Sequence, residues 1–258
     1  AFLGAVVASA CSNPWVGILA APVAGVLVAL LLALFGLRYR VNQIVVGVVL
    51  NVLVSGLTGF LFSTFLSSSP SLNRALRLPT LAVPLLSRIP IIGPVLFRQT
   101  ILVYLMYAAV AVLSVMLFRS RWGLRLRACG EHPKAAEHVG VNVMRTRVAN
   151  LALAGALAGL GGAFFTVGSG LSFENDMTAG NGYIALAAMI LGAWRPLGSL
   201  GAALLFGFAT SVAQTLPVIG SSVSPDIISM IPYIVTILAV AGFVGKVRAP
   251  AAEGVPYP

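Results

Sequence analysis

The chain has 258 residues, of which 59% are hydrophobic and 9% charged, and its formal net charge is +10. A soluble domain of this length carries about a quarter charged residues, so the composition excludes a water-solvated globule and predicts that lipid covers the exterior. A basic excess in a membrane protein collects in cytoplasmic loops and contacts anionic headgroups, so the charge does not call for nucleic acid as a partner.

Apolar runs follow one another along the chain. They cover 16–36, 44–62, 100–118, 148–168, 199–214 and 227–245, with a shorter run at 182–194 and the end of a further helix at 1–10. A full span needs about 20 residues to cross a ~30 Å core, so the short run predicts broken or partial helices. The predicted fold is all-α, a polytopic transmembrane helical bundle that forms a single domain over 1–258. Because the chain starts in apolar sequence without Met, we expect an N-terminal piece to be missing, and we do not interpret the start as a signal peptide.

A long loop at 67–99 separates the second and third runs and is interrupted by five prolines. Its second half, 81–97, is apolar enough to enter the membrane interface. Irregular backbone at membrane depth is tolerated only where protein or water covers it, so we expect a partly buried loop on the outer face and not a span.

The stretch 123–140 is a polar, Arg-rich island between two apolar runs, and it forms the centre of a loop at 119–147. If this loop is cytoplasmic and the runs alternate, twelve of the sixteen basic residues lie inside. The other four share the 67–99 loop, where the rule that positive charge stays inside weakens. The sequence therefore predicts a cytoplasmic loop that carries a short helical segment.

The run that follows the island is rich in alanine and glycine. Gly155, Gly159 and Ala163 recur every four residues and form a face of small side chains. In lipid such faces let helix backbones approach closely, so we interpret this run as a tightly packed bundle helix.

Polar side chains that could line a solute pathway are few and mostly neutral. Three amides, Asn51, Asn150 and Gln214, lie within predicted spans, where they need a neighbouring helix or water as a partner, and the two asparagines are the candidate pathway residues among them. The outer segment 173–187 adds Glu174, Asn175, Asn181 and Tyr183. These groups suit a polyhydroxylated or heterocyclic solute or an external partner protein, and a solvated loop explains them equally well.

Catalytic and metal-binding patterns find little support. Cys11 and Cys129 fall on opposite faces of the predicted topology and do not form a disulfide framework. His132 and His138 lack a third ligand nearby, so no metal site is predicted. The acidic pair Glu174 and Asp176 has no accompanying nucleophile, which disfavours a membrane enzyme. The long runs contain no charged residue, which disfavours a proton-relay antiporter or a voltage sensor.

Several of these segments together resemble the permease subunits of bacterial ABC importers of the branched-chain amino acid and ribose type, and most of all the nucleoside (simple sugar) uptake permeases. The resemblance covers essentially the whole chain. It is carried by the segments 40–47, 121–128, 130–131, 135–136, 140–143, 177–180, 182–187 and 196–198.

The resemblance implies a coupling helix seated in a groove of a partner ATPase subunit. It assigns this role to Glu131, His132, Pro133, Lys134, Ala135, Ala136, Glu137 and Gly140. The two alanines would allow a close fit and the charged residues would form a polar rim. His132 departs from the Asn or Glu that is more usual before this proline.

The resemblance also implies the other components of an importer. These are an ABC ATPase that binds ATP and Mg, a second, homologous permease in a heterodimer, and an extracellular solute-binding lipoprotein, all at the bacterial inner membrane. This chain has no ATP site of its own, so no cofactor is assigned to it. A nucleoside is the expected cargo, because the candidate pathway offers neutral amides. A branched-chain amino acid or a ribose-like sugar is the alternative cargo, and a stand-alone facilitator or channel is the alternative of another class.

Overall fold

The computed structural model describes residues 1–82, 96–219, 230, 234, 237, 249–255 and 257. These residues form two compact units. The first comprises 1–107, 128–179 and 254–258, and the second comprises 108–127 and 180–253. Each unit is described below by itself.

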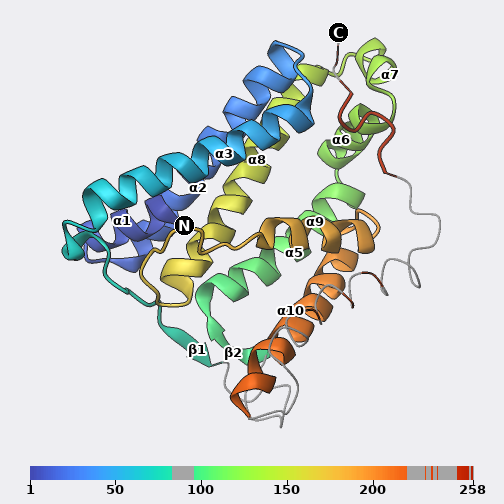
Figure 1. Cartoon of the computed structure of the whole chain (residues 1–258). Helices are drawn as coiled ribbons and strands as arrows, with labels where there is room; N and C mark the ends of the chain where they lie inside the picture. The colour runs from blue at the N-terminus through green and yellow to red at the C-terminus, as the bar shows by residue number, and fades with distance from the viewer. Residues whose placement is uncertain are drawn as a thin grey trace. The chain divides into compact units, whose positions relative to one another are not determined.

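Helices account for almost all regular structure in the described residues (Figure 1). They are α1 (Phe2–Ala10), α2 (Pro14–Ala33), α3 (Gln43–Leu61), α5 (Ile101–Arg119), α6 (Arg121–Glu131), α7 (Pro133–His138), α8 (Val143–Ala163), α9 (Asn181–Leu191) and α10 (Pro196–Val218). The described strands are β1 (Thr80–Ala82) and β2 (Arg98–Thr100), which pair antiparallel with Leu81 opposite Gln99. The predicted all-α class is therefore confirmed.

Within the described residues, five helices are long and apolar enough to cross a membrane, which makes the chain a multi-pass membrane protein. They are Pro14–Arg38, Gln43–Leu66, Ile101–Arg119, Val143–Gly168 and Pro196–Leu216. Three of them, those that contain α2, α3 and α8, end in a single wide π-turn, at Leu34–Arg38, Phe62–Leu66 and Phe164–Gly168. The predicted runs at 16–36, 44–62, 148–168 and 199–214 fall on these helices, and so does the run at 100–118 apart from Thr100, which ends β2. The predicted run at 227–245 lies almost wholly outside the described residues.

Asparagine caps set the starts of three of these helices. The side chains of Asn13, Asn42 and Asn142 accept hydrogen bonds from the backbone N–H of Trp15, Ile44 and Arg145, respectively, at 2.9–3.0 Å. Such a cap satisfies a donor that the first helical turn leaves without a partner. The caps therefore determine where these three helices begin, including α8, whose first turn is polar.

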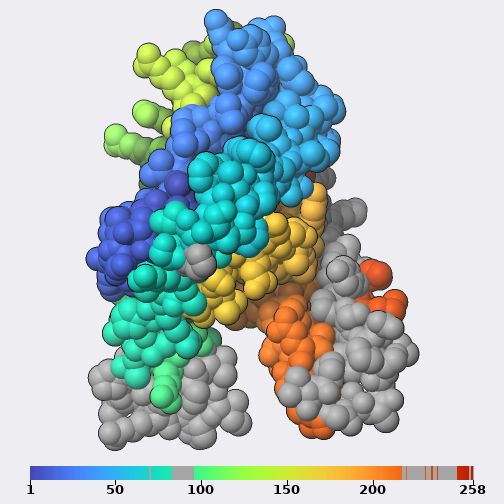
Figure 2. Space-filling model, turned by 60° about the vertical axis from the view of Figure 1, so that its left-hand side comes forward, coloured from blue at the N-terminus to red at the C-terminus, as the bar shows by residue number. Residues whose placement is uncertain are grey.

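Helices α2 and α8 form the most extensive contact in the first unit. A Cβ placed on Gly25 would lie 1.9 Å from the carbonyl oxygen of Gly155, and a Cβ on Gly159 would lie 2.4 Å from that of Ala21. The two backbones therefore touch along the small-residue face that the sequence predicts for α8, and α2 also contributes small residues to this contact. Figure 2 shows α1, α2 and α3, in blue, packed along one face of this unit.

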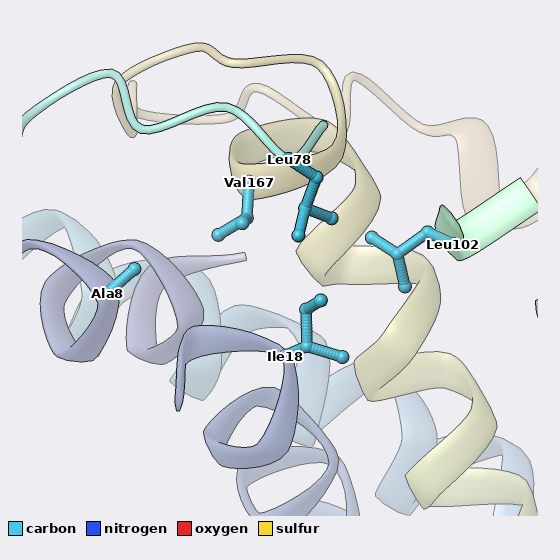
Figure 3. Close-up of a cluster of buried hydrophobic side chains, with 5 residues drawn as sticks. All are labelled: Ala8, Ile18, Leu78, Leu102 and Val167. Carbon is cyan, nitrogen blue, oxygen red and sulfur yellow. The ribbon is translucent and has the colours of Figure 1, made fainter. Parts of the chain in front are cut away.

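The segment before β1 packs onto one end of this bundle. Leu78 joins Ala8, Ile18, Leu102 and Val167 in a buried apolar cluster (Figure 3). Leu78 also donates its backbone N–H to the carbonyl oxygen of Val167 at 3.2 Å. The described part of the 67–99 loop is thus an integral part of the core, while residues 83–95, which include most of its apolar half, lie outside the described residues.

Asn73 fixes the same loop to the segment after α8. Its amide nitrogen donates to the carbonyl oxygen of Phe173 at 2.9 Å, and its amide oxygen accepts from the Phe173 N–H at 2.7 Å. The Phe173 ring packs against the rings of Phe2 and Phe62, with centroids 5.2 and 5.9 Å apart. This clamp holds the residues just before Glu174 in place.

In the second unit, α9 and α10 form a helical hairpin. Ala188 of α9 and Ala202 and Phe206 of α10 make its buried core. With 11 residues, α9 is about 16 Å long and cannot cross a ~30 Å hydrocarbon core. The predicted partial helix is therefore present. Arg195 is one of the twelve basic residues expected on the inner face. Because α9 is too short to cross the membrane, that position would require the residues before α9 to enter the bilayer as well.

Candidate functional site

The polar 119–147 loop contains two helices, where the sequence predicted one short helical segment. The first, α6, covers the Arg-rich part and folds back on the end of α5. Ser120 begins α6 by accepting a hydrogen bond from the Gly123 N–H at 3.1 Å. Gly123 is required here, because a Cβ would lie 2.3 Å from the carbonyl oxygens of Met116 and Leu117. The Arg127 guanidinium stacks over the Phe118 ring at 5.3 Å, which adds a cation–π contact to the fold-back.

The second helix, α7, is set by local chemistry at both ends. His132 has an extended φ of −136°, and Pro133 occupies the first helical position, where its missing N–H costs nothing. Gly140 adopts φ +83° and so turns the chain out of the helix at the other end. The backbone N–H of Val141 then bonds the Ala136 carbonyl oxygen at 3.0 Å. This six-residue helix falls within the segment 131–140 that the resemblance selects.

Solvent exposure divides the candidate coupling residues into two groups. Glu131, His132, Lys134, Ala135, Glu137 and Gly140 are exposed, and Pro133 is half-buried. Ala136 is only 3% exposed and packs inside this chain, against Cys129 and Val143. The expectation that both alanines face a partner therefore needs correction, because only Ala135 lies on the surface.

Val139 was not among the residues selected from the sequence. It follows α7 directly and is 79% exposed, which is unusual for a β-branched apolar side chain outside a membrane-spanning segment. It lies on the loop surface, between the end of α7 and the left-handed Gly140. The sequence signal that could have revealed Val139 is an apolar residue directly before a glycine that ends a helix.

A residue from the C-terminus completes the loop. Tyr257 is buried beside Ala136, and its hydroxyl donates a hydrogen bond to the Glu137 carboxylate. This hydrogen bond, and burial to a lesser extent, raises the pKa of Tyr257. Burial likewise raises the pKa of the neighbouring Cys129 thiol, so that the neutral thiol is favoured.

Four of the candidate pathway residues lie in the first unit. Asn51 is exposed on α3, and Asn150 of α8 donates its amide to the Thr146 carbonyl oxygen one turn earlier at 2.7 Å. Glu174 and Asn175 lie in an exposed turn after Phe173. Asn175 is close to α3, since a Cβ on Gly59 would lie 3.9 Å from its amide oxygen. Asn51 lies on α3 itself, two turns before Gly59, so α3 carries Asn51 and has Asn175 close to it. Asn150 instead bonds within its own helix, α8.

The other two lie in the second unit, at the start of α9. Gly180, with φ +75°, leads into the helix, and the backbone N–H of Tyr183 bonds its carbonyl oxygen at 2.9 Å. The Tyr183 side chain is exposed. Asn181 lines a cavity of about 340 Å³ between α9 and α10, a volume at the lower end of small-molecule sites.

The α9–α10 cavity has a polar end and an apolar end. Asn181, Thr210, Ser211 and Gln214 supply the polar groups, and Ile184, Ala188 and Phe206 are among the apolar ones. Thr210, Ser211 and Gln214 were not predicted as site residues, although the spacing 210, 211, 214 places them on one helix face. These groups can exchange hydrogen bonds with a neutral solute, and they offer no ionised partner for a charged one.

Metal-binding and disulfide chemistry receive no support from the described residues. Within them, no three His, Cys, Asp or Glu side chains are grouped as metal ligands, and Cys11 and Cys129 are both free. The first cysteine is exposed and the second buried.

Comparison with known proteins identifies relatives over most of the chain. The family model of the branched-chain amino acid transport system permease component matches residues 1–240. The guanosine ABC transporter permease protein NupQ of Bacillus subtilis is 38% identical over 95% of this chain and 77% of its own length. The nucleoside ABC transporter permease protein NupC of Lactococcus lactis is 40% identical over 95% of this chain and 78% of its own.

A more distant relative is named for another solute. The putative glucose ABC transporter permease protein TsgC13 of Haloferax volcanii is 30% identical over 91% of this chain and 76% of its own length. No solved structure matches the chain significantly.

Proposed function

The chain belongs to the permease component family of the branched-chain amino acid transport systems, and from this membership we propose that it is the permease subunit of an ATP-driven importer for nucleosides. The observation that carries the proposal is the 38% and 40% identity, over 95% of the chain, to two permeases named for guanosine and nucleosides. ATP hydrolysis belongs to a separate ABC ATPase subunit in this scheme. The chain itself supplies the transmembrane path and works at the bacterial inner membrane.

In this proposal α7 and its flanks transmit the work of the ATPase. ATP binding closes the ATPase dimer and displaces α7, and the bundle then tilts between outward-open and inward-open states. The exposed residues Lys134, Ala135 and Val139 support this role, because they give a small surface with an apolar centre and a polar rim. The rigid start and stop of α7, at Pro133 and Gly140, would keep that surface in one shape.

The polarity of the candidate pathway supports a neutral cargo. Ribose hydroxyls and base edges exchange hydrogen bonds with amides and hydroxyls, such as Asn181, Thr210 and Gln214 at the polar end of the α9–α10 cavity. A zwitterionic amino acid would favour charged acceptors. A simple sugar fits the same groups, and the similarity to a putative glucose permease makes it the second candidate. Asn51, Asn150, Glu174, Asn175 and Tyr183 are proposed as further pathway residues.

Two more partners complete the proposed importer. A second, homologous permease would pair with this chain, and an external solute-binding lipoprotein would deliver the nucleoside. Exposed apolar side chains along α3, such as Ile44, Val48 and Val52, are available to lipid or to the second permease. No nucleic acid is expected as a partner.

Purification of the intact complex from its native membrane, through a tag on this chain, tests the proposal. We expect an ATPase and a second permease to copurify. In proteoliposomes with the binding protein outside, we expect ATP inside to drive uptake of labelled guanosine above uptake of glucose or leucine. Uptake down a gradient without ATP or ATPase would instead establish a facilitator, and preferred uptake of glucose or leucine would replace the nucleoside as cargo.

A further inference from the structure

The C-terminal residues pack against the polar 119–147 loop, far away in sequence. Tyr257 is 6% exposed and lies in one apolar cluster with Cys129 of α6, Ala136 of α7 and Val143 of α8. Residues 254–258 belong to the same compact unit as α7 and α8. Burial of a tyrosine outside a helix or strand requires a site that packs the ring and provides a partner for the hydroxyl.

Polar contacts fix the position of this segment at three points. The Tyr257 hydroxyl donates to the Glu137 carboxylate on α7. The Arg147 guanidinium of α8 donates to the Val255 carbonyl oxygen at 3.0 Å and lies 5.6 Å from the centre of the Tyr257 ring. One short segment therefore bonds to α7 and α8 at the same time.

Helix α7 has little else to hold it. It has six residues, no described side chain caps it, and Ala136 is its one buried side chain. Isolated helices this short are unstable in water, so tertiary contacts must determine where it lies. The methyl group of Ala136 contributes little apolar area, and the Tyr257 ring is the largest side chain packed in its cluster.

We propose that Val255 and Tyr257 act as a strap that locks α7 to the start of α8, with Tyr257 as a positioning residue for coupling. The proposal rests on the function proposed above, in which α7 receives the push of the ATPase. With the strap in place, a displacement of α7 moves α8 with it, and α8 passes the movement to α2 through the Gly25–Gly155 contact. Without the strap, α7 would swing on its His132 and Gly140 ends while α8 stayed behind.

The buried Cys129 offers a direct test of the strap itself. Cys129 is 2% exposed and packs in one cluster with Tyr257. In the complete complex carrying Cys11→Ser, it should therefore react slowly with a maleimide. We expect Tyr257→Ala to speed this reaction by at least about tenfold, since a tenfold change in an opening equilibrium corresponds to only ~1.4 kcal/mol. The exposed Tyr39→Ala is the matched control and should leave the rate unchanged. An unchanged rate in Tyr257→Ala would show that the strap does not cover the loop, and would overturn the proposal.

The positioning role is tested by the number of nucleosides imported per ATP hydrolysed in proteoliposomes. We expect Tyr257→Ala to lower this ratio several-fold while the ATPase still copurifies in full amount and hydrolyses ATP. Tyr257→Phe keeps the ring and removes the bond to Glu137, so it should lower the ratio less. Faster labelling with an unchanged ratio would overturn the role of Tyr257.

Failure of the proposed function gives a different result. If the wild-type complex shows no ATP-driven uptake at all, both the importer function and the coupling role fall. The labelling rates would then still decide whether the strap exists.

Discussion

Val139 is a single side chain at which the proposed contact with the ATPase can be tested. It is 79% exposed on the surface of the 119–147 loop, where no lipid is expected to cover it. If the ATPase groove buries this side chain, Val139→Asp places a carboxylate in an apolar contact. We expect the dissociation constant of the ATPase subunit to rise at least about 30-fold, a loss of ~2 kcal/mol. Binding of the ATPase to the permease in nanodiscs measures it.

A matched change on the opposite membrane face serves as the control for Val139. Leu171 is also exposed, at 57%, and lies after the outer end of α8 in the proposed topology. Leu171→Asp should leave ATPase binding unchanged. Equal binding by the Val139→Asp and wild-type chains would remove Val139 from the ATPase contact.

The hydrogen bond between Tyr257 and Glu137 has a predictable pH dependence. It raises the pKa of Tyr257 above the ordinary value of 10.0. A group whose pKa is higher in the folded state stabilises that state fully below its unfolded pKa, and the stabilisation is lost as pH rises through the folded value. The Tm difference between wild type and Tyr257→Phe should therefore be constant between about pH 7 and 9 and shrink above about pH 10. A difference that grows with pH would contradict this hydrogen bond.

The residues of the loop differ in how well sequence reveals them. Pro133 and Gly140 are local signals, so the place of the short helix could be predicted from the sequence around it. The inward position of Ala136 and its contact with Tyr257 could not be predicted. They depend on the contact of α7 with Tyr257, which lies 120 positions after Glu137. The sequence around either residue gives no signal of the other.

At the scale of elements, the contact between α2 and α8 is the most demanding in the first unit. A Cβ on Gly155 would lie 2.4 Å from the Gly25 carbonyl oxygen and 2.5 Å from the Ala29 Cβ, so the helices must separate to admit it. We expect Gly155→Ala to lower the free energy of unfolding by about 1–3 kcal/mol, in spite of the better helix propensity of alanine. Thermal denaturation in detergent measures the loss as a lower Tm.

Helix α8 also supplies the control for this prediction. A Cβ on Gly161 meets no described atom within 4 Å. Gly161→Ala should therefore be neutral or slightly stabilising. If Gly155→Ala and Gly161→Ala had the same Tm, backbone contact would not hold this helix pair.

The start of α8 gives a second prediction for this helix. The Asn142 side chain accepts from the Arg145 N–H at 2.9 Å, and its loss leaves that donor without this partner. Asn142→Ala should cost about 1 kcal/mol of stability, and Asn142→Asp should recover it, because aspartate also caps and its charge favours a helix start. The two Tm values, compared with that of wild type, check this. If the alanine and aspartate variants melted together, the cap would contribute nothing.

The extent of most helices follows from apolar runs, but α6 shows where that approach fails. Because α6 contains three arginines and one glutamate, the stretch was predicted as part of a polar loop and not as a helix. A helical signal was nevertheless present, since Trp122, Leu126 and Cys129 recur at spacings of four and three. The start of α8 was also missed, because its first turn is polar and Asn142, not hydropathy, determines where it begins.

At the scale of the whole molecule, charge and hydropathy act together. The five apolar helices give the chain its membrane spans, and the basic residues between them favour one orientation. In that orientation the 119–147 loop lies on the side where ATP is available, which the coupling role of α7 requires. The proposed function therefore depends on the sidedness of this loop.

Sidedness can be measured with single cysteines in a chain that carries Cys11→Ser and Cys129→Ser. Arg125→Cys in α6 and Ser71→Cys in the 67–99 loop are both at exposed positions. Because most basic residues are expected on the cytoplasmic side, a membrane-impermeant maleimide added to intact cells or spheroplasts should label Ser71→Cys and leave Arg125→Cys unreacted. In inside-out vesicles the pattern should reverse, and permeabilised membranes should label both. External labelling of Arg125→Cys would place α7 away from the ATP pool, and coupling through this helix would then be impossible.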